Sequence, residues 1–308
     1  MQVLQSTTEA VFARGATVAI GNFDGVHLGH RALLTRARDL ARADDCAAVA
    51  LTFGPHPARF FAPELAPPLI TTEGQKLSLM AETGLDAAVV EPFDAQLAAM
   101  PPEDFVRRVL VERLAARHVV VGRGFVFGRG RSGDIETLEA LGEALGFVAH
   151  GIDPVRAGAI VVSSTKIREF ILMGRVRGAA TLLGRPFEIV GRVVDGDGRG
   201  RKIGIPTANL DADNELVPGR GVYLGWVELQ RGDRFHAVIN VGTAPTVRKV
   251  IRTTIEGHLL DFEENIRGQR IAIGFRQRLR DERRFESVDD LVTAIRLDIA
   301  NARELLRG

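Results

Sequence analysis

Two stretches of this 308-residue chain carry residue types that suit phosphate groups, and the first lies near the N-terminus. It runs from Gly21 to His30, with the sequence GNFDGVHLGH, and contains His27 three positions before His30. An apolar run precedes it and a helical pattern follows, so both imidazoles are expected near a helix N-terminus, where unpaired backbone N–H groups and the helix dipole attract anions. Histidine donates to phosphate oxygens and stabilises charge on a leaving pyrophosphate. The spacing and the strand–helix context favour this interpretation over two incidental surface histidines.

The second stretch is the glycine-rich run over residues 191–204, which leads into the segment IPTAN over 205–209. Backbone N–H groups of glycines can surround phosphates, although an ordinary hairpin loop is the alternative. Three basic side chains of the run can offset phosphate charge: Arg199, Arg201 and Lys202. Thr207 and Asn209 are two positions apart on an expected strand, so their side chains point to one face. Hydroxyl and amide oxygens of this kind can ligate Mg²⁺.

A candidate general base lies in the expected strand over residues 253–260. The alternation of a strand places Glu256 and His258 on one face. A glutamate in a cleft can accept the proton of a primary hydroxyl as that hydroxyl attacks the γ-phosphate of ATP. A glutamate that only forms a cross-strand ion pair is the alternative.

A helix start over residues 163–168, with the sequence SSTKIR, offers a further phosphate contact. Ser164 or Thr165 could cap the helix, and Arg168 would lie about one turn further on. Hydroxyls and a guanidinium at a helix start suit phosphate, although many caps of this kind bind no ligand.

The elements that must position these residues fall into two groups. Over residues 17–185, apolar runs alternate with helical patterns, which predicts βαβ units and a parallel sheet. The strands are expected over 17–20, 47–52, 86–90 and 118–121, and the helices over 30–42, 75–82, 103–115 and 134–145. Short strands over 187–194, 221–229, 235–241, 253–260 and 270–275 then predict a small β-barrel. A closing helix follows Ser287, its expected N-cap, and the domains are expected to span 1–185 and 186–308.

Composition narrows the class of protein. The 40 Lys and Arg residues balance 39 Asp and Glu residues, so net charge gives no case for nucleic-acid or membrane binding. The hydrophobic fraction of 45% argues against a disordered chain. Cys46 is the only cysteine and fits a reducing compartment. No secretory signal and no apolar run of membrane-spanning length is evident. We therefore expect a soluble, cytoplasmic protein with small-molecule partners, with homo-oligomerisation left open.

The N-terminal motifs resemble the adenylyltransferase module of the bifunctional riboflavin kinase/FAD synthetase family of bacteria. The segments that carry the resemblance are GNFDGVHLGH at 21–30, TFGPHP at 52–57, GRGFVFG at 122–128 and SSTKIR at 163–168. The resemblance implies a nucleotidyltransferase-type, doubly wound parallel sheet in which the phosphate of FMN attacks the α-phosphorus of ATP. It implies ATP contacts from Gly21, Asn22, Phe23, Asp24, His27, His30, Ser164, Thr165 and Arg168, with catalytic roles for His27, His30 and Arg168. It implies flavin contacts from Phe53, Pro55, His56 and Phe125, although His56, between two prolines, could equally belong to a rigid turn.

The C-terminal motifs look like a riboflavin kinase module. They are residues 191–209, GVY at 221–223, NVGT at 240–243, EGHLLDF at 256–262 and RDERRF at 280–285. The similarity implies a six-stranded antiparallel β-barrel capped by the C-terminal helix, with Glu256 as the catalytic base. It implies Mg²⁺-ATP bound by Thr207 and Asn209, further ATP contacts from Gly196, Gly198 and Lys202, and flavin contacts from Arg280 and Glu282.

Together the two resemblances imply an enzyme that phosphorylates riboflavin to FMN and then joins FMN to AMP from ATP, which gives FAD. Gly124 stands where the family usually has Asp or Asn, so a weakened adenylyltransferase, or one that uses a neighbouring group, is left open. The first alternative is a monofunctional riboflavin kinase. A non-enzymatic flavin sensor and a nucleotidyltransferase with another acceptor are further alternatives, and the presence of Glu256, Thr207 and Asn209 argues against both.

Overall fold

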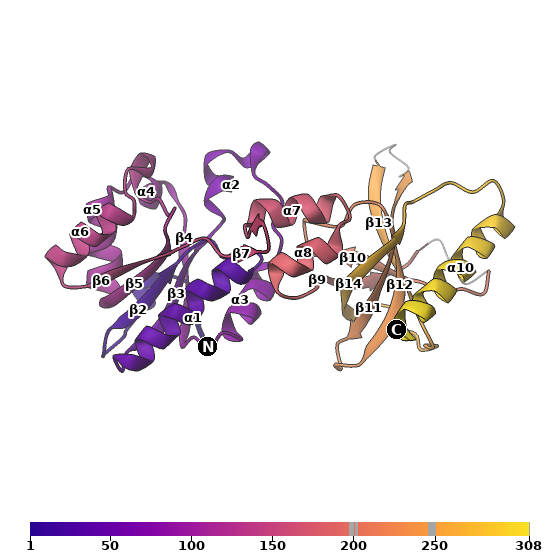
Figure 1. The fold of residues 1–308 in the computed structure, drawn as a ribbon, viewed down its shortest axis with the longest axis horizontal. Coiled ribbons are helices and arrows are strands. Elements are labelled where there is room, and N and C mark those ends of the chain that lie inside the picture. Colours follow the sequence, from indigo (N-terminus) through magenta and orange to yellow (C-terminus); the bar gives the residue numbers. More distant parts are fainter. Residues whose placement is uncertain (197–199, 201–202, 246–250, 308) are drawn as a thin grey trace. The chain divides into compact units, whose positions relative to one another are not determined.

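The computed structural model describes residues 1–196, 200, 203–245 and 251–307, and its ribbon is drawn in Figure 1. Contacts between residues divide the chain into two compact units. The first comprises Met1–Pro68 and Glu73–Ser163, and the second comprises Leu69–Thr72 and Ser164–Gly308. Residues 164–185 thus make most of their contacts within the second unit, and the domain boundary expected near residue 185 stays a prediction.

The first unit is built on a six-stranded sheet in the order β1-β4-β3-β2-β5-β6, in which every neighbouring pair is parallel. The strands are β1 (Gln2–Leu4), β2 (Ala16–Ile20), β3 (Ala47–Gly54), β4 (Ala87–Pro92), β5 (Ala116–Gly122) and β6 (Val148–Ile152). The predicted parallel sheet is confirmed. Two strands of this sheet were not predicted. Strand β1 is too short to show a pattern, and the apolar run of β6 is interrupted by His150 and Gly151.

Helices cover both faces of this sheet (Figure 1). On one face, α1 (Leu28–Ala43) and α3 (Glu73–Ala81) pack Leu34 and Met80 against alanines of the central strands. On the other face, the π-helix η3 (Phe105–Arg113) and α6 (Ile135–Leu145) pack Leu110 and Leu138 against valines and leucines of the same strands. A sheet buried on both faces explains why its strands read as continuous apolar runs, and the doubly wound arrangement is confirmed.

The helix expected over 103–115 forms with a different winding. A short α5 (Pro102–Asp104) runs into η3, where the N–H of Leu114 donates to the carbonyl of Val109 at 3.2 Å, five residues back. The buried residues Phe105, Val106, Val109 and Leu110 have a spacing that an α-helix also shows, so the apolar pattern does not reveal the wider winding. The remaining short elements are η1 (Thr7–Glu9), α2 (Pro57–Phe61), η2 (Pro63–Leu65), α4 (Ala95–Ala98), η4 (Arg129–Arg131), β7 (Arg156–Ala157) and β8 (Ile160–Val161).

The second unit contains a closed barrel of six antiparallel strands in the order β10-β13-β12-β11-β14-β9. The strands are β9 (Phe187–Val194), β10 (Ala208–Ala212), β11 (Gly221–Leu229), β12 (Arg234–Pro245), β13 (Ile251–Leu259) and β14 (Arg270–Arg280). The predicted barrel is confirmed. Strand β14 extends beyond the expected end at residue 275, because its pairing with β11 continues as far as Val222 and Arg280 despite the polar side chains.

In the described part of the second unit, the barrel is accompanied by helices α7 (Ser164–Leu172), α8 (Val176–Leu183) and α10 (Val288–Arg307). The expected N-cap of the closing helix is confirmed, since the N–H of Asp290 donates to Oγ of Ser287 at 3.1 Å. Helix α10 packs on the barrel through one apolar cluster (Figure 1). The cluster comprises Val222, Leu224, Val238, Leu260, Leu279, Ile299, Ala302 and Leu306.

Candidate active sites

The loop between β2 and α1 carries the first predicted phosphate motif. Strand β2 ends at Ile20, and the N–H of Gly21 then donates to the carbonyl of Leu51 in β3 at 3.1 Å. Phe23 and Val26 have φ angles of 51° and 36°, in the left-handed region that bulky and β-branched side chains rarely adopt. Both side chains are fully buried, so packing enforces this backbone. Strained backbone that the fold over-determines in this way is typical of functional loops.

His27 and His30 lie together at the N-terminal turn of α1. His27 is the N-cap, and its Nδ1 accepts a hydrogen bond from the backbone N–H of His30 at 3.2 Å. The two rings stack with centroids 3.6 Å apart and planes inclined by 16°. The helix begins at Leu28 rather than at His30 itself, which leaves both imidazoles at its positive end as expected. This position suits the binding of an anion such as a triphosphate.

One cation beside this loop was not singled out from the sequence. Lys76 of α3 donates from Nζ to Oγ1 of Thr52 at 3.2 Å, and Oγ1 of Thr52 donates to the carbonyl of Asn22 at 3.2 Å. Asn22 lies in the loop between β2 and α1. A single lysine on a helix carries no sequence signal of such a role, because the contact joins three segments that are separate in sequence.

An aromatic cavity of about 650 Å³ adjoins the same loop. Gly21, Asn22 and three of the predicted flavin contacts line it, namely Phe53, His56 and Phe125. Pro55 does not line the cavity. Four further aromatic residues, which no sequence motif indicated, also line it: Phe61, Phe93, Phe105 and Phe127. Such a lining suits a planar, largely apolar ring system.

Two features of this cavity bear on the expectations for His56 and Gly124. His56 lines the cavity and also caps α2, because its Nδ1 accepts a hydrogen bond from the N–H of Ala58 at 3.1 Å. A flavin contact and a place in a rigid turn are therefore compatible for this residue.

Gly124 lines the cavity as well, and a Cβ atom added there would meet no atom within 4 Å. The position can therefore accept the polar side chain that the family usually carries.

The predicted contacts Ser164, Thr165 and Arg168 lie in the first turns of α7. Ser164 begins the helix, and Arg168 is 8% exposed. Because α7 belongs to the second compact unit, the approach of these side chains to the histidines stays a prediction.

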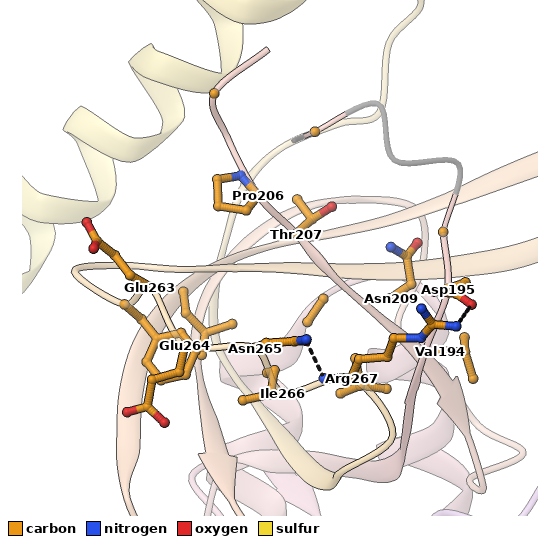
Figure 2. Close-up of a pocket in the computed structure, with 17 residues that line it drawn as sticks. Val194, Asp195, Pro206, Thr207, Asn209, Glu263, Glu264, Asn265, Ile266 and Arg267 are labelled. Carbon is orange, nitrogen blue, oxygen red and sulfur yellow. Dashed lines mark hydrogen bonds and ion pairs between the residues drawn. The ribbon is translucent and has the colours of Figure 1, made fainter. Parts of the chain in front are cut away.

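A second cavity, of about 520 Å³, lies at one end of the barrel, and Figure 2 shows its lining. Gly196, Thr207 and Asn209 line it together, and their roles as contacts of ATP and of the metal ion stay predictions. Gly196 approaches Asn209 closely, since a Cβ atom at Gly196 would lie 2.2 Å from Nδ2 of Asn209. The predicted contacts Gly198, Arg199, Arg201 and Lys202 lie outside the described residues.

The opposite wall of this cavity was not foreseen. It is formed by Phe262, Glu263, Glu264, Asn265, Ile266 and Arg267. The guanidinium of Arg267 pairs with the carboxylate of Asp195, next to Gly196 (Figure 2). Asn265 accepts the N–H of Arg267 at 3.1 Å, which shapes the turn. This wall is one consecutive segment, but it faces residues 193–209 only through the tertiary structure, so no local pattern reveals it.

Glu256 lies directly opposite Asn209 in the pairing of β13 with β10, and directly opposite Asn240 in the pairing of β13 with β12. Residues opposite one another in a ladder share a face, so the carboxyl group stands between the two amides. His258 bonds through Nδ1 to the carbonyl of Pro206 at 2.8 Å and so holds the segment that precedes Thr207. The predicted base and the predicted metal ligand Asn209 are thus neighbours on the barrel.

The two predicted flavin contacts of the barrel have different surroundings. Oε1 of Glu282 accepts the N–H of Thr243 at 3.3 Å and crowds Gly242, near the face that carries Glu256. Arg280 forms an ion pair with Asp298 of α10 at 2.7 Å, and that carboxylate is largely buried. Arg280 therefore attaches the closing helix to β14, and its contact with flavin stays a prediction.

Comparison with known proteins identifies both halves of the chain. Residues 10–166 match the family model described as FAD synthetase, and residues 183–306 match the one described as riboflavin kinase. A bifunctional riboflavin kinase/FMN adenylyltransferase of Pseudomonas fluorescens is 39% identical over 95% of this chain and 93% of its own length. The proteins of the same description from Escherichia coli K12 and Bacillus subtilis are 39% and 32% identical over 94% and 92% of this chain, and over 92% and 90% of their own lengths.

A crystal structure described as a macrolide-efflux protein from Streptococcus pneumoniae shares the fold. It superposes with a TM-score of 0.87 and 29% identity, and the match covers 98% of each chain. Among the described residues, the helices include none that is long and apolar enough to cross a membrane.

Proposed function

This chain belongs to the bifunctional riboflavin kinase/FMN adenylyltransferase family, and from that premise we propose how its residues divide the two reactions. The enzyme phosphorylates riboflavin with ATP, which gives FMN and ADP. It then transfers the AMP group of a second ATP to FMN, which gives FAD and pyrophosphate. Nothing observed favours a monofunctional kinase.

In the kinase reaction, the cavity lined by Gly196, Thr207 and Asn209 is the proposed ATP site. Glu256 is the proposed base: it accepts the proton of the 5′-hydroxyl of riboflavin as that oxygen attacks the γ-phosphorus and the bond to the β-phosphate oxygen breaks. Its position opposite Asn209 supports this role, because Asn209 would hold the end of the nucleotide that reacts. Glu282 and Arg280 are the proposed flavin contacts.

The donor chemistry of this cavity fits Mg²⁺. Thr207 and Asn209 offer hydroxyl and amide oxygens, which are the hard donors that this ion takes. Among the described residues, no group of three or more His, Cys, Asp or Glu side chains could hold a metal ion. Because Mg²⁺ usually keeps several waters and binds substrate phosphates, the ion would take further ligands from ATP and from water, and it would neutralise charge on the phosphates.

In the adenylyltransferase reaction, His27, His30 and the backbone of residues 21–24 are the proposed ATP site, with Ser164, Thr165 and Arg168 as further contacts. A phosphate oxygen of FMN forms a bond to the α-phosphorus, and pyrophosphate leaves as the bond to the β-phosphate oxygen breaks. The two imidazoles at the helix N-terminus stabilise the charge on that leaving group. The aromatic cavity is proposed to hold the flavin ring through Phe53, His56 and Phe125. A contact from Pro55, which does not line the cavity, stays a prediction.

The observation that carries this assignment is a separate cavity in each unit, each lined by residues predicted for one reaction. The test uses the full chain with purified substrates and chromatography of the flavin products. Glu256→Gln should abolish the formation of FMN from riboflavin while FMN is still converted to FAD. His27→Asn combined with His30→Asn should do the reverse. Loss of both activities in either variant, with an intact fold by circular dichroism, would contradict separate sites.

Two further expectations stay predictions: a cytoplasmic location and the absence of nucleic-acid and membrane partners. Homo-oligomerisation stays open. Fractionation of cells would test the location, and light scattering of the purified chain would test homo-oligomerisation.

A further inference from the structure

Lys76 occupies an unusual place for a lysine. Its side chain is only partly exposed, although lysine is among the residues that most often remain in water. Nζ reaches inward from α3 to the hydroxyl of Thr52, which is fully buried at the carboxyl end of β3. That hydroxyl in turn bonds to the carbonyl of Asn22, the second residue of the loop between β2 and α1. One charged group thus anchors the loop through a single intermediate side chain.

The charges around Lys76 give its ammonium a second consequence. Burial lowers the pKa of Lys76, while the carboxylates of Glu73 on its own helix and Asp24 in the loop oppose that effect. Asp24 is only 4% exposed, so its field is poorly screened by water. An incoming triphosphate would meet this negative charge. The positive charge of the Lys76 ammonium offsets the negative charge of Asp24.

We propose that Lys76 is a positioning residue for FMN adenylylation, which acts through Thr52 on the carbonyl of Asn22 and through its charge on Asp24. It holds the loop in the shape that receives ATP and lowers the electrostatic cost of the phosphates. This inference deepens the proposed adenylyltransferase site and rests on it. The rate of the kinase reaction is expected not to depend on Lys76.

The experiment compares four variants of the full chain: Lys76→Met, Lys76→Arg, Thr52→Val and the double variant Lys76→Met/Thr52→Val. Lys76→Met keeps the length of the side chain without its charge. It should lower kcat/KM for FAD formation from FMN and ATP by about 10–100-fold, the range that the loss of a hydrogen bond to a charged group implies. Thr52→Val should lower it in the same direction. The double variant should lose little more than Lys76→Met alone, because both changes break one chain of contacts.

The recovery of rate and the pH profile of Lys76→Arg distinguish an effect of charge from a merely structural role of Lys76. Arginine keeps the charge and a donor, so most of the rate should return. The wild-type rate should fall as pH rises through the lowered pKa of Lys76, since the charged form is the active one, and this fall should move to higher pH in Lys76→Arg. Riboflavin phosphorylation by the same samples should stay at the wild-type level.

Several outcomes would overturn the inference: wild-type FAD formation by Lys76→Met, additive losses in the double variant, an unchanged alkaline limb in Lys76→Arg, or equal losses of both activities. If Lys76→Met does not fold, Thr52→Val and Lys76→Arg still decide the question. His27→Asn separates this inference from the site assignment. Loss of FAD formation in His27→Asn with wild-type rates in the Lys76 variants would reject the role of Lys76 alone.

Discussion

Gly196 allows a direct test of the kinase cavity, because its missing side chain leaves room for Asn209. In Gly196→Ala the new Cβ atom would lie 2.2 Å from Nδ2 of Asn209, and real Cβ atoms essentially never approach another atom closer than 3.0 Å. The amide must therefore move by about 0.8 Å or more, and a misplacement of roughly 1 Å at a reacting group can lower a rate about 100-fold. This corresponds to about 2.7 kcal/mol of transition-state stabilisation.

The assay is the initial rate of FMN formation over a range of ATP concentrations, with adenylylation of FMN measured on the same sample. We expect kcat/KM for riboflavin phosphorylation to fall by roughly 100-fold, the loss that a displacement near 1 Å implies, with adenylylation unchanged. The melting temperature should change little, because the atom displaced belongs to the end of a side chain rather than to backbone. A wild-type kinase rate would refute the role of Asn209, and with it the reading of this cavity as the ATP site.

The matched control adds the same methyl group to β13, the strand that pairs with the strand of Asn209. In Gly257→Ala the Cβ atom would meet the nearest side-chain atom, of Val227, at 3.5 Å, which is ordinary van der Waals contact. Gly257 also faces away from Glu256, its neighbour in β13, because successive side chains alternate. Near-wild-type activity is expected, and a loss equal to that of Gly196→Ala would show that any added methyl group disturbs the barrel.

Three further substitutions each test the surroundings of one residue. Gly124→Asn should speed FMN adenylylation without loss of stability, because the cavity has room for a side chain there; equal rates in wild type and variant would remove the concern over Gly124. Asp298→Ala should lower the free energy of unfolding by about 3 kcal/mol, because it removes the ion-pair partner of the partly buried Arg280. Urea titration measures this change, and an unchanged midpoint would contradict the prediction. Burial raises the pKa of Glu188, so the ionised carboxylate weakens the fold as pH rises through that value. Glu188→Gln should therefore raise the melting temperature more at neutral than at acidic pH, and an equal shift at both would argue against it.

Much of the fold was predictable because the signals are local. The apolar run at residues 17–20 and the helical pattern after it report on neighbours within a few positions, and β2 and α1 form where those patterns predicted. The placement of His27 and His30 follows from the same junction. Elements without a pattern of their own were missed, such as the three-residue β1 and the wide winding of η3.

The residues by themselves determined which segments become helix or strand, and which side chains can carry phosphate chemistry. The tertiary structure alone decided which of those side chains meet. Glu256 faces Asn209 because β13 pairs with β10 in one register, and a slip of one residue would turn the carboxylate to the other face. Lys76 bonds to Thr52, and Thr52 to Asn22, only because α3 packs beside the end of β3. Such meetings depend on strand order and register, which no stretch of sequence encodes locally.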